Sequence, residues 1–359
     1  MGKRKGIRKW LLVLCIALAL AGAACFAGAR QLSGKLASQY AAERWRGESG
    51  TAYGQVSCFV PVDEKLTLSQ IYEFRTNLLQ RLHESGADAD TEETLFVDAW
   101  SCSGKALATT DLGKGDANVI AVGGDFFQFH PLLLLSGSYI QGSDLMKDRV
   151  LLDEDLAWLL FGGTELQGLT LKINGVPFQV AGVIRREQDF ASKKAYTAGM
   201  GLFMSYDAWS AMNEGAGITA YELVSAEPVK NYAVSFVREK FPIGGGEIVQ
   251  NTGRFSMGNL LWLVTQFGTR SMQKLGVLLP YWENAARCME DYCALLYFLA
   301  WVLILTPGIV LLVSLIRLLR RGRDKLAEDV FPAWKDGAEE FVRVRQRRRW
   351  EKKHGKHEA

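Results

Sequence analysis

Two uncharged, strongly apolar segments place the tightest constraint on how this chain of 359 residues can fold. They are Trp10–Ala29 and Tyr292–Ile316, and about 260 residues of ordinary globular sequence lie between them. A helix needs roughly 20 apolar residues to cross the hydrocarbon core of a bilayer, and each segment is that long. The sequence therefore predicts two transmembrane helices on either side of one large region.

The charges beside these segments predict their orientation. The basic residues that flank them are Lys3, Arg4, Lys5, Arg8 and Lys9 before the first segment and Arg317, Arg320, Arg321 and Arg323 after the second. The net charge is +5 over the first nine residues, +6 from Arg317 onward and −8 over the remainder. Because Lys and Arg are enriched on the cytoplasmic side, we expect a plasma-membrane protein with both termini in the cytoplasm and the central region outside.

The predicted domain organisation follows from this topology. A basic cytoplasmic N-terminus (1–9) leads into the first transmembrane helix (10–29), an extracytoplasmic domain (30–291), the second transmembrane helix (292–316) and a basic cytoplasmic tail (317–359). Basic residues near a membrane attract anionic inner-leaflet lipids by about 1 kcal/mol each. Nucleic acid is the alternative partner for a basic run, but the tail has few aromatic residues to stack on bases, so we expect lipid and no nucleic acid. The basic run is Arg343, Arg345, Arg347, Arg348, Arg349, Lys352 and Lys353.

The first apolar segment has two further interpretations. Ala27-Gly28-Ala29 fits the A-x-A pattern of signal-peptide cleavage. Cys25, which follows Gly22-Ala23-Ala24, is an incomplete signal for lipid attachment. An uncleaved anchor is the interpretation that the family resemblance described below favours.

Cys58 and Cys102 are the cysteines that lie away from both apolar segments. Each lies in a strand-like run, and the outside of a cell permits disulfides. A bridge between Cys58 and Cys102 is one expectation, and a pair of buried thiols is the alternative. No CxxC spacing or histidine partner indicates a metal site.

The central region alternates between strand-like and helix-like patterns. Strand patterns cover 51–60, 95–100, 119–122, 149–152, 169–173, 178–184, 199–204 and 220–225, and helix patterns cover 31–46, 66–83, 153–161, 206–212 and 229–241. Asn174-Gly175 lies between two alternating runs and predicts a hairpin. The order predicts an α+β domain. Residues 260–279 are predicted to form a helix packed on the domain, not a third span, because Gly268, Arg270 and Lys274 interrupt the apolar run.

Residues 131–209 carry a resemblance to a known family. They contain, in order, a strand-like run, an acidic helix start, a helix end, a second strand-like run and a hairpin: Val150-Leu151-Leu152, Asp153-Glu154-Asp155-Leu156-Ala157, Leu160-Phe161-Gly162, Gly168-Leu169-Thr170-Leu171, and Ile173-Asn174-Gly175 with Phe178–Val183. In order and spacing this segment resembles the periplasmic core domain of MacB/FtsX-type ABC transporter permeases. About 80 residues match well, and the arrangement of span, outer domain and span extends the likeness to most of the chain.

The resemblance implies a mechanical role, because the family's outer domain passes nucleotide-driven motion of its helices to an extracytoplasmic substrate or partner. It implies a separate ABC ATPase subunit, since this chain has no Walker-type Gly-x-x-x-x-Gly-Lys-Ser/Thr motif, and a second permease or a second copy of this chain. Family permeases usually have four spans, whereas this sequence predicts two. A complete permease, a half that pairs with a larger permease, and a descendant separated from transport are all open at this stage.

Two features near the second span are candidates for coupling motion. Tyr281, Trp282, Glu283, Asn284 and Arg287 form the candidate coupling element, because polar and aromatic residues meet there at the membrane boundary and Glu283 and Arg287 have the i, i+4 spacing of a helical ion pair. An aromatic belt at a helix start is the plain alternative. Pro307-Gly308 predicts a kink within the second span, which is either a flexing point or an ordinary bend.

The sequence contains none of the usual signatures of an enzyme. His83 and His130 are the histidines outside the tail, HExxH and GxSxG motifs are absent, and the set of SxxK, SDN and KTG motifs is not present together. We therefore expect no catalytic residues, no cofactor and no metal. The predicted function is a permease-like subunit of an ABC transporter complex; a membrane-anchored binding or sensory module without transport is the alternative, and a cell-surface hydrolase is the remaining one.

Overall fold

The computed structural model describes residues 2–48, 50–86, 95–196, 200–242, 245–269, 276–325 and 331–354. The chain divides into two compact units. Ala27–Phe298 form one unit, and Met1–Phe26 together with Leu299–Ala359 form the other. The first of these contains the predicted domain and the segments that enter and leave it.

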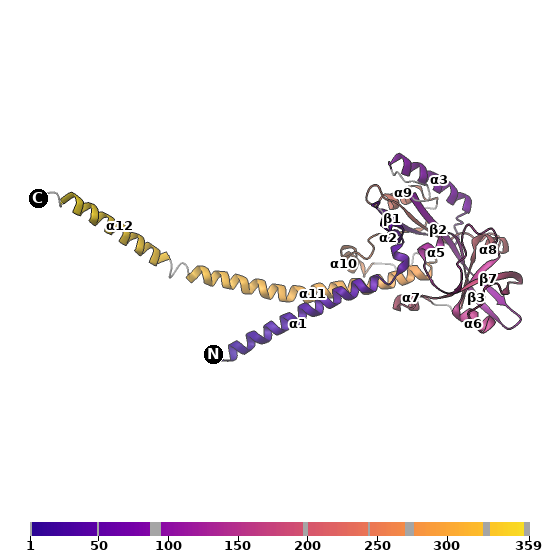
Figure 1. Ribbon diagram of the computed structural model, residues 1–359, viewed down its shortest axis with the longest axis horizontal. Coiled ribbons are helices and arrows are strands. Elements are labelled where there is room, and N and C mark those ends of the chain that lie inside the picture. Colours follow the sequence, from indigo (N-terminus) through magenta and orange to yellow (C-terminus); the bar gives the residue numbers. More distant parts are fainter. Residues whose placement is uncertain are drawn as a thin grey trace. The chain divides into compact units, whose positions relative to one another are not determined.

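A single ten-stranded sheet organises the unit Ala27–Phe298 (Figure 1). Its strands are β1 Tyr53–Phe59, β2 Phe96–Thr109, β3 Lys114–Gly124, β4 Leu133–Gly137, β5 Arg149–Asp153, β6 Thr170–Ile173, β7 Val176–Arg185, β8 Gly201–Ser205, β9 Ala220–Ala226 and β10 Glu247–Gln250. They follow the order β10-β1-β9-β2-β3-β8-β5-β7-β4, and β6 pairs with both β2 and β7. The β3–β8 and β5–β7 pairs are parallel and the other pairs are antiparallel.

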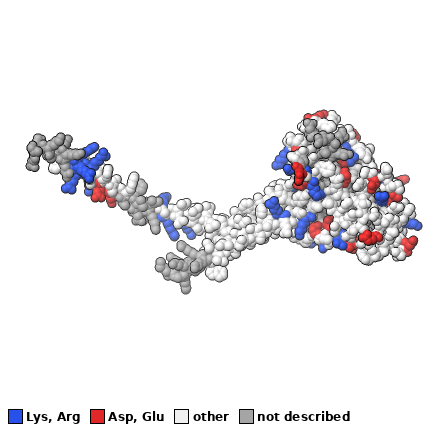
Figure 2. All heavy atoms as spheres, in the orientation of Figure 1, with Lys and Arg blue, Asp and Glu red and all other residues white. Residues whose placement is uncertain are grey.

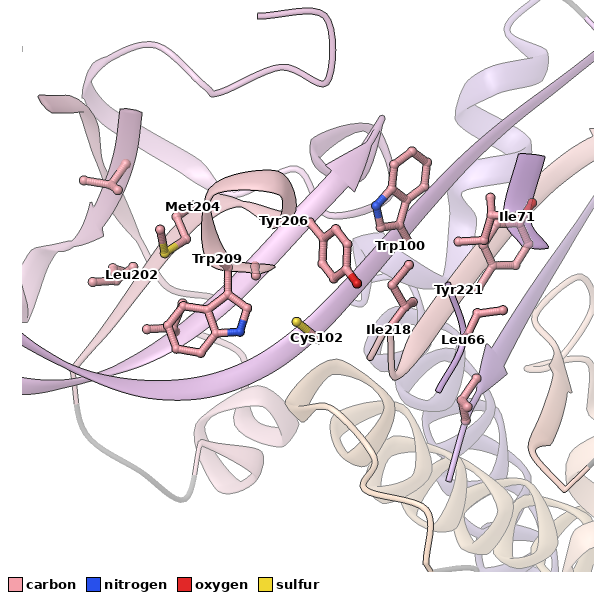
Figure 3. Close-up of a cluster of buried hydrophobic side chains, with 14 of the residues drawn as sticks. Leu66, Ile71, Trp100, Cys102, Leu202, Met204, Tyr206, Trp209, Ile218 and Tyr221 are labelled. Atoms are coloured by element: carbon pink, nitrogen blue, oxygen red, sulfur yellow. The ribbon is translucent and has the colours of Figure 1, made fainter. Parts of the chain in front are cut away.

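The helices cover both faces of this sheet. They are η1 Ala37–Tyr40, α2 Ala41–Arg46, α3 Leu68–Glu84, α5 Phe126–Phe129, α6 Glu154–Phe161, α7 Phe190–Ala195, α8 Tyr206–Met212, α9 Tyr232–Lys240 and α10 Met257–Gln266. One apolar cluster joins the sheet to α3, α6, α8 and α9, and Figure 3 shows part of it. A second cluster on the opposite face contains residues of α2 and α5 and also Trp282, at the start of α11 Tyr281–Lys325. The predicted α+β fold is confirmed.

Several turns and helix ends lie where local sequence signals predicted them. Asn174 and Gly175 both have positive φ, 49° and 87°, which is what the turn of the β6–β7 hairpin requires. Asp153 caps α6 by accepting a hydrogen bond from the Leu156 amide at 2.8 Å. Gly162 ends α6 in the left-handed conformation.

Four predicted segments differ from the structure. The helix predicted over 31–46 is interrupted, because α1 Gly2–Ser33 ends before η1 and α2 begin. The helix predicted over 260–279 is α10, which ends at Gln266, while Val277 pairs with Pro61 in an isolated bridge; residues 270–275 lie outside the described residues. Strands β2 and β3 extend well beyond 95–100 and 119–122, because they pair with each other from Ala99–Gly124 to Thr109–Lys114.

The expected disulfide between Cys58 and Cys102 is not formed, and both side chains are buried free thiols. Strand β9 lies between β1, which carries Cys58, and β2, which carries Cys102. Two strand spacings separate Cα atoms by roughly 9–10 Å, whereas a disulfide needs them within about 7 Å. Cys102 lies near Tyr206, Trp209 and Ile218 (Figure 3). Burial raises the pKa of the Cys58 thiol above its ordinary value and that of Cys102 to about 12.

Two helices in the described part of the chain are long and apolar enough to cross a membrane. The candidate membrane-spanning stretches are Trp10–Ser33 of α1 and Tyr281–Asp324 of α11. Figure 2 shows a largely uncharged surface along the middle of the two helices on the face in view, and it shows Lys and Arg side chains near the end of α11 and on α12 Phe331–His354.

Gly22 lets the two apolar helices approach closely in the unit that they share. A Cβ atom at Gly22 would lie 2.6 Å from Cγ1 of Ile304 and 3.0 Å from the carbonyl oxygen of Ala300. Small residues at such contacts let helix backbones approach each other in a membrane.

Gly22→Leu should therefore force α1 and α11 apart and lower the melting temperature of the detergent-solubilised chain, at a cost of about 1–3 kcal/mol. The matched control is Gly28→Leu in the same helix, since a Cβ there meets no atom within 4 Å. Equal melting temperatures for the two variants would contradict the close packing.

Candidate functional site

The first turn of α11 is anchored in the core of the domain. The Trp282 side chain is 3% exposed, and its ring centroid lies 5.6 Å from that of Phe126 and 4.4 Å from that of His130. These contacts place Trp282 in the apolar cluster on the α5 face of the sheet. The start of α11 is thus held by domain packing and is not a free aromatic belt.

Next to Trp282, Glu283 is a fully buried carboxylate held by two arginines. Its oxygens accept hydrogen bonds from Arg254 at 2.7 and 2.9 Å and from Nε of Arg287 at 2.8 Å. The Glu283–Arg287 pair has the predicted i, i+4 spacing. The sequence suggested an exposed helix pair worth a few tenths of a kcal/mol, but both side chains are buried. Removal of one partner from a buried pair leaves an uncompensated charge.

Arg254 joins α11 to the loop between β10 and α10. It makes a second bidentate contact, to Glu290 at 2.8 and 3.0 Å. Burial alone would lower the pKa of the Arg254 guanidinium, but the charges of Glu283 and Glu290 outweigh it and raise that pKa above its ordinary value. The guanidinium is therefore charged at any physiological pH, and so the ion pairs persist. Arg287 adds a contact with Glu247 of β10.

A chain of hydrogen bonds continues from Arg254 into the sheet. Nη1 of Arg254 and Nδ2 of Asn251 both donate to Oε1 of Gln39, at 3.1 and 2.9 Å. The Ser57 hydroxyl lies 3.0 Å from Oδ1 of Asn251 and 3.1 Å from Oε1 of Glu222. Through these hydrogen bonds the first turns of α11 are connected to the neighbouring strands β1 and β9.

This series of hydrogen bonds ends at a buried histidine, His130. Nε2 of His130 lies 2.5 Å from Oε2 of Glu222. Nδ1 of His130 and Nε1 of Trp282 are buried with no hydrogen-bond partner among the described residues. A cavity of about 20 Å³ lined by both side chains is large enough for one water molecule. We refer to the whole set as the junction network: Gln39, Ser57, His130, Glu222, Glu247, Asn251, Arg254, Glu283, Arg287 and Glu290.

Tyr281 ties α11 to the segment around α7. Its ring stacks on that of Tyr196 with centroids 4.4 Å apart, and the hydroxyls of both tyrosines bond to Glu187. Burial raises the pKa of the Tyr196 phenol, and the nearby charge of Glu187 raises it further. Asn284 donates to the carbonyl of Leu279 at 3.1 Å and so holds the turn that enters the helix.

The structure brings all five residues of the candidate coupling element into this junction, while Pro307 and Gly308 lie further along α11, in the other unit. Sequence reasoning missed Arg254, Gln39, Glu222 and the place of His130. A signal existed in the strands: Gln55 and Ser57 alternate with buried Val56 and Cys58, and Glu222 lies within the apolar strand β9. Buried polar residues at alternate positions require partners. Gln55 finds them in the backbone of Ser38 and Ala41, and Ser57 and Glu222 find them in the junction network.

The junction is a set of hydrogen bonds and ion pairs between the start of α11 and the domain. Within the described residues no three His, Cys, Asp or Glu side chains are arranged to hold a metal ion. The bidentate and charge-assisted contacts of the junction are the stronger kind of hydrogen bond, and they fix the orientation of the helix start relative to the sheet.

Residues 48–234, more than half of the chain, match the family model described as the MacB-like periplasmic core domain. The chain belongs to this family. It is accordingly an ABC-transporter-type membrane protein, and proteins of the MacB/FtsX type are permease-like subunits that work with ABC ATPase partners. Seven residues of the junction network lie outside the part that matches the MacB-like model: Gln39, Glu247, Asn251, Arg254, Glu283, Arg287 and Glu290.

Several solved structures are similar to this MacB-like chain. The periplasmic region of MacB from Actinobacillus actinomycetemcomitans has 14% identity and a TM-score of 0.42, covering 60% of this chain and 94% of that one. The extracellular domain of the noncanonic ABC-type transporter YknZ from Gram-positive bacteria has 14% identity and a TM-score of 0.38, covering 55% and 98%. A domain of a putative permease protein from Porphyromonas gingivalis has 13% identity and a TM-score of 0.31, covering 55% and 87%. No curated protein sequence matches the chain.

Proposed function

We infer that this protein is a permease-like membrane subunit of an ABC transporter complex that transmits motion between a separate ATPase and its own MacB-like domain. The observation that carries the inference is the junction network. A helix can tilt or lift a domain only if their connection is stiff, and Glu283, Arg254 and Glu290 make this connection through buried bidentate ion pairs. Helix α11 then continues without interruption to Lys325.

The partners follow from the same inference. The ATPase is a separate polypeptide, because the chain has no Walker-type motif. A second permease or a second copy of this chain completes the membrane part, and the basic helix α12 binds anionic inner-leaflet lipid. Pro307 and Gly308 supply a flexing point within the span.

The function is tested by purifying the tagged full chain with its ATP-binding partner and measuring ATPase stimulation. Glu283→Gln keeps the side-chain shape but removes the charge shared by Arg254 and Arg287, so we expect the complex to assemble and to lose most of its stimulation. The matched control is Glu154→Gln, which alters the more exposed Glu154–Arg185 pair. Full stimulation by Glu283→Gln, or the absence of any ATP-binding subunit, would reject the transmitter role.

The predicted orientation is tested by labelling. In a background with the natural cysteines replaced by alanine, a membrane-impermeant thiol reagent should label Glu214→Cys in intact cells, because that position is exposed in the outer domain. It should not label Gly355→Cys until the cells are opened. Labelling of position 355 in intact cells would reverse the topology, and a mature N-terminus at Arg30 would identify the first segment as a signal peptide.

A cleft favours the second candidate function, a binding or sensory module. It has a volume of about 640 Å³ and is lined by Arg75, Trp100, Phe127, Tyr139 and Lys147, among others. Aromatic and charged side chains around a concave site suit a small ligand or peptide. In this case α1 and α11 are anchors only, and Glu283→Gln would leave ligand binding unchanged.

A further inference from the structure

Helix α10 carries no charge, and large apolar side chains are exposed on it and close to it in the sequence. The side chains of Met257, Trp262 and Phe267 are 37%, 65% and 39% exposed, and Leu278, just before α11, is 61% exposed. No ionisable residue lies between Arg254 and Arg270. Solvent-facing helices normally carry charged residues on the outer side, so an uncharged outer side with an exposed tryptophan is unusual for a helix surrounded by water.

The buried side of α10 packs against the early turns of α11, which sets the position of α10 along that helix. Leu260 is 1% exposed and belongs to the same buried cluster as Met289 and Cys293 of α11 and Ala29 of α1. At this level the outward side of α11 itself turns apolar, with Tyr292 and Leu295 both exposed. Figure 1 shows α10 beside the part of α11 that belongs to the same compact unit. The exposed surface of α10 is therefore continuous with the start of the predicted span.

The polar side chains of α10 are satisfied locally. Asn259 donates to the carbonyl of Gly253 at 2.9 Å, and the Thr265 hydroxyl donates to the carbonyl of Trp262 at 2.6 Å. Polar groups that already have partners cost less to remove from water. These bonds lower the cost of moving α10 into a less polar environment.

Helix α7 adds a second element at the same level. The ring of Phe190 packs edge-on against Tyr292 at 4.8 Å, and Nζ of Lys194 donates to the Tyr292 hydroxyl at 3.1 Å. Aromatic rings and lysines are favoured where lipid head groups begin, and the lysine charge complements lipid phosphate. The combination of aromatic, lysine and uncharged helix favours lipid over a protein partner.

We propose that α10 is an interfacial membrane helix that seats the MacB-like domain on the adjacent leaflet, with Trp262 and Phe267 buried at the boundary between phospholipid head groups and acyl chains. Such helices lie in the plane of the interface and bind through the apolar area that they bury. Together with α7, helix α10 fixes the distance between the domain and the bilayer. Motion of α11 then acts on a domain that is held against the membrane surface.

The test uses the full chain in nanodiscs of phosphatidylcholine and phosphatidylglycerol. A photoreactive benzophenone amino acid replaces Trp262, Trp262→p-benzoylphenylalanine, and lipid adducts are measured by mass spectrometry after irradiation. The matched control is Trp158→p-benzoylphenylalanine, because Trp158 is 56% exposed and lies on α6, away from α10 (Figure 1). We expect roughly tenfold or more lipid adduct at 262 than at 158, as for a side chain buried in the interface.

Equal lipid adducts at the two positions would overturn the proposal. A protein cross-link at 262 in place of lipid would also overturn it, by showing that a second copy or another subunit covers α10. Phe267→p-benzoylphenylalanine provides an independent second position that the proposal places at the same boundary, and its failure to label lipid while the chain remains folded would count against the proposal.

Discussion

Arg254→Met should lower the free energy of unfolding of the full chain by about 3–5 kcal/mol, because it removes the positive charge that pairs with the buried carboxylate of Glu283 and with the partly buried carboxylate of Glu290. Arg254 is 7% exposed and is bidentate to both Glu283 and Glu290. Methionine keeps much of the side-chain volume, so that lost charge and not lost packing accounts for the effect. Denaturant unfolding of the detergent-solubilised chain, followed by circular dichroism, measures it.

Two variants serve as controls for this prediction. Arg254→Lys keeps the positive charge but lacks the planar set of N–H donors that bonds to two carboxylates. Its decrease in the free energy of unfolding should therefore be smaller than that of Arg254→Met. Arg185→Met removes the arginine from the more exposed pair with Glu154 and should have little effect. A loss for Arg254→Met no larger than that for Arg185→Met would show that the junction pairs contribute nothing to stability.

Trp282→Ala should also cost about 3–5 kcal/mol, because it empties a large site in the core, and it should loosen the start of α11. Trp282 packs against Phe126 and His130 and connects the helix to the apolar cluster of the α5 face. Without it the junction keeps its ion pairs but loses its apolar anchor. Amide hydrogen exchange over residues 281–290, measured by mass spectrometry, should become faster.

Two tryptophan variants separate this local effect from a general one. Trp282→Phe retains an aromatic ring and removes the buried, unpaired Nε1, so most of the stability should be kept. Trp158→Ala removes a side chain that is 56% exposed and should leave exchange in 281–290 unchanged. If Trp282→Ala left that exchange unchanged as well, α11 would not be anchored through Trp282.

The candidate coupling element could be predicted because its signals are local. Tyr281, Trp282 and Asn284 stand out where polar and aromatic residues meet an apolar run, and the spacing of Glu283 and Arg287 is that of a helical pair. The partners of these residues were not predictable in the same way. Arg254 and Glu222 are 29 and 61 residues from Glu283 along the chain, and no pattern within a short window relates residues so far apart.

The sequence by itself determined the two apolar segments, the basic flanks, the β6–β7 hairpin with its Asn174-Gly175 turn, and the α+β pattern of the MacB-like domain. These features depend on composition, periodicity and backbone preference over a few residues. Only the tertiary structure decided that β9 separates Cys58 from Cys102, that Glu283 is buried between two arginines, and that α10 lies beside the start of the span. Strand order and the burial of charge arise from contacts between distant segments, and the free energy of those contacts is set by the packing of the whole fold.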